Sequence, residues 1–459
     1  MTSRPDRAWK GRAQVVAGCL ALAVAFVPAA SFAQGVPVVR DAETEALIRD
    51  YMGPIWKVAG VTPPKVWIVP DQSFNAFVTG RGNLYVNVGT IIQCETPNEL
   101  IGVLAHETGH MANDDIARLT QQIDETKTAM LLASVLGVGV AAAGAVTGSN
   151  ALGQAGSAVL SGTSSVASRS VLHFQREQES AADRNAIKYL TATGQSGAGM
   201  LATMKRLADQ NLLLSQSINP FLQSHPLPKE RVAELEALIA KSPYTSSIDA
   251  SQLQLRHDLV RAKLVGFTWS ADKVLRRYPI SDNSLAARYA RAIVAYRSGK
   301  PGPAQAAIDG LVKSDPGNPF FEELKGQALL ETGHPDQAIA PLRKAVALAP
   351  KSTLIKMLLG LALTANPSPA NAAEAVKLLA PALVGDAAPA EGYHALARAY
   401  AVTGDEAMAQ LATAQGMFVE GNYNEARIQA TRAQAKLKNG SPAWLRADDI
   451  VSYKPSKMR

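Results

Sequence analysis

Two histidines four residues apart, with a glutamate directly after the first, stand out in the stretch ETPNELIGVLAHETGHMAND, residues 95–114. At this spacing on a helix, the imidazoles of His106 and His110 leave the same side about one turn apart. Two neutral imidazoles so placed can bind one Zn²⁺ ion, and Glu107 is close enough to take a proton from a water molecule held there. The pattern predicts a zinc site of the hydrolytic type rather than a solvated helix with two surface histidines.

The residues before the histidines carry the start signals of a helix. Thr96 can act as the N-cap, Pro97 suits the first helical position, and Glu99 completes a capping box. Apolar residues then recur with helical spacing. We therefore expect a helix from about Pro97 to about Ala112.

A catalytic zinc site needs a third protein ligand and a fourth position open to water or substrate. The strongly helical stretch HFQREQESAADRNAIKYL, residues 173–190, offers Glu177, Glu179 and Asp183. Glu179 and Asp183 are four residues apart and share one helical face. Such a charged run is also typical of a solvent-facing surface, so the residues alone leave the third ligand open.

The elements that must position this site are a helix, three strands and a helical hairpin. Residues 39–60 have the pattern of an amphipathic helix. KVWIV (65–69) and NLYVNVG (83–89) read as strands, and FNAFVTGRG (74–82) reads as a third strand that enters a turn.

The hairpin is expected over residues 129–172, which are rich in alanine, glycine and small polar residues. Residues 129–146 carry no charge and just reach the length of a membrane span, but they are weakly hydrophobic. We expect this hairpin to pack on the active-site face or to touch a membrane surface peripherally.

Length and composition suit a multidomain protein with sizeable cores. The chain has 459 residues, of which 47% are hydrophobic, and a net charge of +7. These values indicate two or three domains. No cluster of lysines and arginines reads as a nucleic-acid surface, so we expect no nucleic-acid partner.

The N-terminus has the organisation of a cleavable signal peptide, residues 1–33. A basic region ends at Arg12, an apolar stretch follows, and Ser31 and Ala33 suit the −3 and −1 positions of a cleavage site. This arrangement predicts export to a bacterial periplasm. The alternatives are an uncleaved membrane anchor and lipoprotein processing at Cys19.

Cysteine usage agrees with an exported chain that has no disulfide. The sequence has two cysteines, and cleavage of the signal peptide would remove Cys19 and leave Cys94 alone. Stability must then come from apolar cores and from metal binding.

An internal repeat begins near residue 285, with a period of roughly 34 residues, which is typical of tetratricopeptide repeats. Its mark is a glycine followed five residues later by an alanine, and the glycines are Gly299, Gly333, Gly404 and Gly421. In the clearest copy, small residues stand at the tetratricopeptide positions Gly326, Ala338 and Ala345, and we expect them to let two antiparallel helices approach closely. A generic alanine-rich helical bundle is the alternative.

Together these features predict an α+β, mostly helical fold: a zincin-like metallopeptidase domain with a small sheet, followed by an α-solenoid of tetratricopeptide repeats. The expected segments are a signal peptide at 1–33, a metallopeptidase domain at 34–241, a linker with lead-in helices at 242–284, repeats at 285–445 and a tail at 446–459.

HETGH and the later REQESAAD resemble the motifs of the HtpX/Ste-type zinc metallopeptidases. FNAFVTGRGNLYVNVGTI is similar to the strand–turn–strand that precedes the helix in that family. The resemblance implies that His106 and His110 are zinc ligands and that Glu107 is the general base. It also implies Glu179 as the third ligand and Asp183 as the residue that fixes the tautomer of a liganding imidazole.

SHPLPKER, residues 224–231, resembles a further segment of the family. His225, held between a serine and a proline, is expected either to be a fourth zinc ligand or to donate a hydrogen bond to the oxyanion of the reaction. Arg231 is expected to pair with a carboxylate of the site.

With the signal peptide and the repeats, the resemblance implies a periplasmic endopeptidase that binds one Zn²⁺ per chain and hydrolyses envelope proteins. It implies a role in the quality control and assembly of outer-membrane proteins, with unfolded or stalled outer-membrane proteins as substrates. The repeats would bind the outer-membrane assembly machinery. The alternative is a chaperone or assembly factor with a closed, latent zinc site and a repeat domain that binds proteins.

Overall fold

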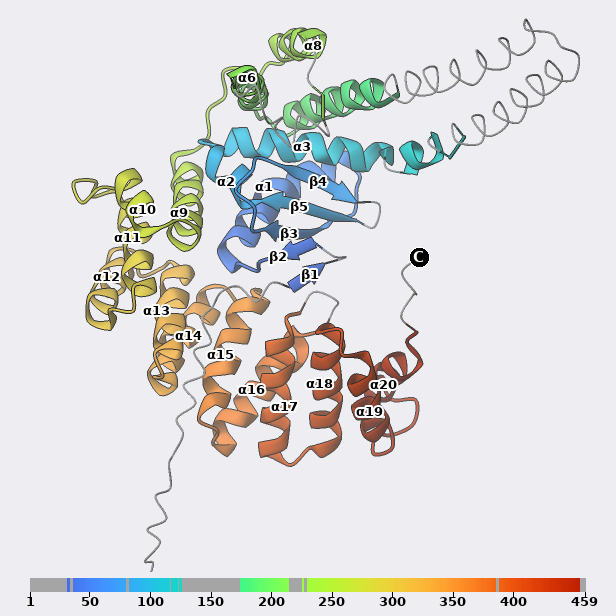
Figure 1. Cartoon of the computed structure of the whole chain (residues 1–459), viewed down its shortest axis with the longest axis vertical. Coiled ribbons are helices and arrows are strands. Elements are labelled where there is room, and N and C mark those ends of the chain that lie inside the picture. Colours follow the sequence, from blue (N-terminus) through green and yellow to red (C-terminus); the bar gives the residue numbers. More distant parts are fainter. Residues whose placement is uncertain are drawn as a thin grey trace, which may run out of the picture.

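The computed structural model describes the following residues: 31–33, 36–79, 82–115, 117–122, 124–125, 174–213, 225–226, 229–384 and 388–454 (Figure 1). Most of the predicted signal peptide and the whole predicted hairpin at 129–172 lie outside these residues. Among the described helices, none combines the length and apolar character that a bilayer crossing requires. The fold is α+β and mostly helical, as predicted.

A small three-stranded sheet lies under the central helix of the N-terminal region, which is the described part of the chain up to residue 240 (Figure 1). Its order is β3 (Lys65–Val69), β5 (Asn83–Asn87) and β4 (Ala76–Thr79). The central β5 runs parallel to β3 and antiparallel to β4, so β4 is an edge strand. A short ribbon, β1 (Ser31–Ala33) with β2 (Val36–Val38), precedes the sheet.

The predicted strand at 83–89 ends at Asn87, because the next residues form α2 (Val88–Gln93). At this turn Gly89 donates to the carbonyl of Asp71 over 2.8 Å. A Cβ on Gly89 would lie 2.1 Å from the carbonyl oxygen of Gln72, so only glycine fits there.

Two helices cover the sheet. α1 (Ala42–Ala59) is capped by the side chain of Asp41, which accepts from the Thr44 N–H. α3 (Pro97–Asn113) is the helix predicted from its capping signals, and Thr96 accepts from the Glu99 N–H over 3.3 Å. The two helices pack against each other, so α3 is held between α1 and the sheet on one side and later helices on the other (Figure 1).

The later helices of the N-terminal region lie across α3 from the sheet (Figure 1). They are the helical residues 174–192, α6 (Ala198–Leu213) and α8 (Lys229–Ala240). Gly102 lets α6 come close, because a Cβ there would lie 2.6 Å from the Cβ of Met200. Gly102 thus brings α3 and α6 within backbone distance.

The residues predicted as linker and lead-in helices form α9 (Ser251–Thr268) and α10 (Ala271–Arg277). α9 packs against α1, α2, α3 and α11, and its buried side chains belong to the same apolar core as the sheet. The segment is therefore an integral part of the packing between the two regions.

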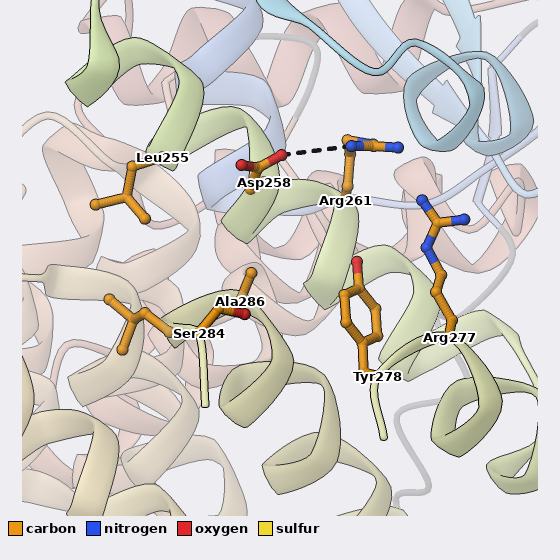
Figure 2. A pocket seen from close by; sticks show the side chains of 8 residues that line it. Leu255, Asp258, Arg261, Arg277, Tyr278, Ser284 and Ala286 are labelled. Carbon is orange, nitrogen blue, oxygen red and sulfur yellow. Dashed lines mark hydrogen bonds and ion pairs between the residues drawn. The ribbon is translucent and has the colours of Figure 1, made fainter. Parts of the chain in front are cut away.

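A cavity of about 330 Å³ lies where α9, α10 and the start of α11 meet. Figure 2 shows Arg277 and Tyr278 extending from the end of α10 toward Arg261 and Asp258 of α9. Arg261 is bound to Asp258 and to main-chain carbonyls, so the cavity wall is held by internal hydrogen bonds.

The repeat region follows as consecutive helices that pack against one another along the chain (Figure 1). The helices are α11 (Leu285–Arg297), α12 (Pro301–Ser314), α13 (Pro319–Glu331), α14 (Pro335–Leu348), α15 (Thr353–Ala365), α16 (Pro369–Ala382), α17 (Ala390–Thr403), α18 (Glu406–Val419), α19 (Tyr423–Gln434) and α20 (Pro442–Ser452). The last helix continues beyond the predicted repeat boundary at 445.

The four glycines that mark the repeat period lie in turns between helices. Gly299, Gly333, Gly404 and Gly421 have φ between 66° and 83°, and no atom would crowd a Cβ at any of them. They are needed for left-handed turns between helices, not for close helix contact. The close helix contact expected at Gly326 is confirmed, because a Cβ there would lie 2.3 Å from Leu342.

Candidate metal centre

Three separate segments bring the predicted site residues together. α3 carries His106, Glu107 and His110 on its buried side. The helical residues 174–192 carry Glu179, and His225 comes from the segment before α8.

A glycine allows the two ligand-bearing helices to meet. A Cβ on Gly109 would lie 2.8 Å from the carbonyl oxygen and 2.9 Å from the Cα of Ala182. Both neighbours are backbone atoms, so no side-chain rotation would relieve the contact. The glycine inside HETGH therefore sets the distance between the histidines and the glutamate helix.

Four buried donors surround one point: His106, His110, Glu179 and His225, with one ligand atom from each within 4.8 Å of the others. Nε2 of His106 lies 3.1 Å from Nε2 of His110 and 3.3 Å from Nδ1 of His225. Carboxylate oxygens of Glu179 lie 3.3 Å from His106, 3.4 Å from His110 and 3.0 Å from His225. Ligand atoms roughly 2.0–2.1 Å from a tetrahedral Zn²⁺ stand about 3.3 Å apart. The donor set therefore has the dimensions of one tetrahedral metal site.

Two aspartates orient the histidines of α3. Nδ1 of His106 lies 2.9 Å from Oδ1 of Asp183, and Nδ1 of His110 lies 2.8 Å from Oδ2 of Asp115. Each carboxylate favours the tautomer with its proton on Nδ1, which leaves the Nε2 lone pair toward the centre.

Asp115 was not among the residues predicted from the sequence. It follows the helix C-cap Asp114, whose φ of 55° turns the chain back. Asp115 is 5% exposed, and its carbonyl accepts from the Gln178 side chain over 2.9 Å. The available signal was the acidic pair directly after α3, but only the left-handed cap brings the second acid to His110.

Arg231 of α8 ties the acidic residues to the His225 segment. Its guanidinium donates to both oxygens of Asp183, over 2.7 and 2.9 Å, and to Glu179 over 2.9 Å. It also donates to the carbonyl of Pro226 over 2.6 Å. One buried arginine thus positions two carboxylates and the backbone that carries His225.

Glu107 lies beside the donor set and is not part of it. The residue is 1% exposed, and its Oε1 has no hydrogen-bond partner among the described residues. Nε2 of His225 lies 3.4 Å from that oxygen. The third acidic candidate, Glu177, is exposed on the helix that carries Glu179.

The carboxylates of the cluster favour a positive charge at the donors, which is either a proton on an imidazole or a metal ion in its place. Burial opposes charge on His106, but Asp183 and Glu179 raise the pKa of its imidazole to about 10. Burial also opposes ionisation of Glu179, yet His225 and His106 hold the pKa of its carboxyl well below its usual range. Against the same burial penalty, His106 and Arg231 lower the pKa of Asp183. The two carboxylates therefore stay ionised at neutral pH and attract positive charge to the donors.

Comparison with family models matches two parts of the chain. The model of peptidase family M48 matches residues 40–239, which include every residue of the cluster. A tetratricopeptide repeat model matches residues 323–391, which run from α13 into α17.

Comparison with characterised proteins finds relatives of two kinds. The chain is 26% identical to a beta-barrel assembly-enhancing protease of Yersinia pestis over 84% of its own length and 78% of the relative's. It is 25% identical to the protein of that description in Escherichia coli over 84% and 77%. It is 31% identical to the protease HtpX of Shewanella denitrificans over 42% of this chain and 74% of that protein.

Proposed function

This chain belongs to peptidase family M48 and is therefore a metallopeptidase, and on that premise we propose that it is a zinc-dependent endopeptidase of the bacterial periplasm. One observation carries the proposal: four buried donors are arranged at tetrahedral distances beside the carboxylate of Glu107. The leader-like N-terminal sequence supports export.

The residues present fit a zinc ion. His106, His110 and Glu179 form a set of two imidazoles and one carboxylate, which is typical of catalytic zinc. Asp183 and Asp115 hold the two imidazoles in the ligating tautomer. When bound, zinc supplies a Lewis acid that polarises the scissile carbonyl and makes water more acidic.

Glu107 is the proposed general base. Its buried Oε1, which has no hydrogen bond among the described residues, can take a proton from the attacking water and pass it to the leaving amine.

His225 is the proposed restraint on the resting enzyme. Its Nδ1 lies in the donor set, where it takes the position that water needs, and its Nε2 faces the Glu107 carboxylate. Activity would then require His225 to leave the donor set. The other role that the sequence left open, hydrogen bonding to the oxyanion, predicts the opposite effect when His225 is removed.

The substrate is proposed to be a polypeptide in extended form. β4 pairs with β5, and no other described strand pairs with it. The unpaired edge can accept a peptide as an added strand beside α3, which packs against β4.

The relatives described as beta-barrel assembly-enhancing proteases support a biological role. We propose that this chain acts on unfolded or stalled outer-membrane proteins and that its repeat region binds the outer-membrane assembly machinery. A second candidate is a chaperone or assembly factor whose metal site is closed, and the four-donor set favours it. The number of protein ligands at rest and during turnover distinguishes the two.

Metal content and peptide cleavage of matched variants test the proposal. Glu107→Gln should abolish cleavage and keep one zinc per chain, because Glu107 is base and not ligand. Glu179→Ala should lose the metal, whereas Glu177→Ala, an exposed glutamate on the same helix, should keep both metal and activity. A folded Glu107→Gln protein without metal, or a Glu179→Ala protein with full zinc, would contradict these roles.

His225→Ala tests the restraint. If His225 occupies the resting site, cleavage should increase, including cleavage of non-cognate polypeptides, with the metal retained. If it is an oxyanion donor, turnover should fall by about 10²-fold or more. Unchanged activity would remove His225 from both roles.

A further inference from the structure

The first turn of α1 is inserted between helices that follow the N-terminal region. Ala42 packs in an apolar group with residues of α14 and α15: Ala345, Leu354, Ile355 and Met357. The two acidic neighbours of Ala42, Asp41 and Glu43, point into the same contact between the N-terminal and repeat regions.

A cluster of charged groups is buried at this contact. Nζ of Lys263 on α9 lies 2.6 Å from Asp41 and 3.5 Å from both Glu43 and Glu323. The Tyr289 hydroxyl of α11 donates to Glu43 over 2.9 Å. We call these five residues the Lys263 cluster. Four of them are at most 6% exposed, so water screens their charges poorly.

The cluster holds more acids than its one ammonium group can neutralise. Asp41 is the N-cap of α1, and Thr44 donates to it through both N–H and hydroxyl. Against the penalty of burial, Lys263 and Thr44 lower the pKa of Asp41, so Asp41 is the carboxylate that stays ionised. Lys263 is then already paired, and Glu43 and Glu323 remain with weak compensation.

Burial raises the pKa of Glu43 and of Glu323 to about 7, although Lys263 opposes the shift. The ionised Asp41 adds to the shift in both.

Nearby charges outside the cluster are paired elsewhere. Glu45 is paired with Arg40 and Arg49, and Glu322 with Lys344. The ring of Phe320 lies 5.6 Å from the Lys263 ammonium. The groups that act on Glu43 and Glu323 are therefore the other members of the cluster, which come from α1, α9, α11 and α13.

We propose that the Lys263 cluster is a proton-dependent latch between the N-terminal and repeat regions. The latch is closed while Glu43 and Glu323 hold protons and weakens when both ionise. A carboxyl whose pKa is higher in the folded chain stabilises the contact fully below its ordinary pKa of 4.5, and that stabilisation is lost as pH rises through about 7. The stabilisation is therefore lost between about pH 4.5 and about pH 7.

The latch lies on the helix that also supports the metal-binding helix. His257 and Arg261 of α9 lie 2.9 and 3.2 Å from the carbonyls of Cys94 and Ile92, just before α3 begins. Lys263 is half a turn further along the same helix. When the latch weakens, α9 should therefore hold the start of α3 less firmly.

Hydrogen exchange of the full-length protein, read by mass spectrometry over residues 40–47 and 259–266, tests the latch. At pH 8 Glu323→Gln should slow exchange in both segments about tenfold relative to wild type, since a neutral amide replaces a carboxyl that ionises there. At pH 5, near the lower end of this range, the difference between the two proteins should be much smaller.

Glu331→Gln is the matched control. Glu331 is on the same helix α13, and burial raises its pKa to about 7 as well, but it accepts from Tyr296 inside the repeat region. This variant should leave exchange in both segments unchanged. An equal effect of the two variants, or a Glu323→Gln effect that is the same at pH 5 and pH 8, overturns the proposal.

Lys263→Met gives an independent reading. It removes the ammonium and should speed exchange of the two segments at pH 8, with protection returning toward that of wild type at pH 5, where both glutamates are protonated. Equal loss of protection at both pH values contradicts a proton-dependent latch.

Discussion

The metal centre and the repeat helices place opposite kinds of residue at their buried positions. Around the metal centre, the facing sides of α3 and of residues 174–192 carry histidine, glutamate and aspartate. In α13 to α16 the facing sides carry alanine, leucine, isoleucine and glycine. The metal centre thus depends on a few polar atoms, whereas the repeat helices depend on many apolar contacts that each contribute a similar small stabilisation.

The two regions should therefore respond differently to substitution. A buried charge without its partner is strongly destabilising, so the metal centre tolerates few changes. Each repeat buries its apolar face on its neighbours, so one altered contact weakens the array locally. The regions are nevertheless not independent, because one apolar core runs from Leu47 of α1 to Ala328 of α13.

The largest expected effect comes from the closest helix contact of the metal centre. Gly109→Ala would place a Cβ against the backbone of Ala182 and push Glu179 away from the histidines. A displacement near 1 Å can lower activity by about 10²-fold. Gly53→Ala on α1, where no atom lies within 4 Å, is the control and should keep full activity. A fully active Gly109→Ala enzyme would show that the helices can separate without harm.

Truncation tests whether the two regions can be separated. A chain ending at residue 250 loses α9 and leaves the carbonyls of Cys94 and Ile92 without their partners His257 and Arg261, each worth about 1–3 kcal/mol. We expect it to unfold at lower temperature and to hold zinc poorly. A chain ending at residue 421, which keeps α9, should retain its zinc. Equal zinc content and melting temperature in the two would show that the N-terminal region folds alone.

Acid should act on the N-terminal region through His257. Burial lowers the pKa of this histidine to about 4, and the neutral ring lies between Tyr51 and the Cys94 carbonyl. Its contribution is present above pH 6.5 and is lost as pH falls toward 4, up to about 3 kcal/mol. Urea unfolding from pH 7 to 4 should show a smaller loss for His257→Gln than for wild type.

The control for this acid effect lies in the repeat region. His394 is only partly buried and pairs with Glu420. His394→Gln should unfold with the same dependence on pH as the wild type. If it changes that dependence as much as His257→Gln does, the effect is not specific to the N-terminal region.

The smallest effects are expected in the repeats, where two glycines give opposite signs. Gly326→Ala meets Leu342 and should destabilise the protein by about 1–3 kcal/mol. Gly310→Ala meets no atom within 4 Å and should stabilise α12 by up to about 1 kcal/mol. Chemical denaturation measures both, and peptide cleavage should change little in either. Equal stability changes would mean that the repeats absorb the added methyl group.

Local signals made α3 and the repeats predictable. The capping residues of α3 and its apolar spacing act within a few turns of helix, so the start at Pro97 follows from neighbouring residues. The repeat period was visible because each turn needs a glycine with positive φ, as at Gly333 and Gly404. The left-handed conformation of these glycines was not predictable, because the spacing of residues does not reveal φ.

Contacts between distant segments were less predictable. Asp115 reaches His110 because the helix ends in a left-handed cap at Asp114, and the acidic pair in the sequence does not predict that cap. α9 reads as a lead-in helix, yet His257 and Arg261 bind the corner before α3. Such side chains look ordinary in sequence, because their partners are far away along the chain.

By itself, the sequence determined the chemistry available to this protein: two histidines one helical turn apart, a glutamate beside them, and an acidic helix further along. It also determined where the helices begin and how the repeats recur, since both depend on interactions between near neighbours. Only the tertiary structure decided that His225 joins the donor set and that Lys263 is buried among three acids. Those arrangements depend on packing between remote helices, which brings charges together that no local pattern pairs.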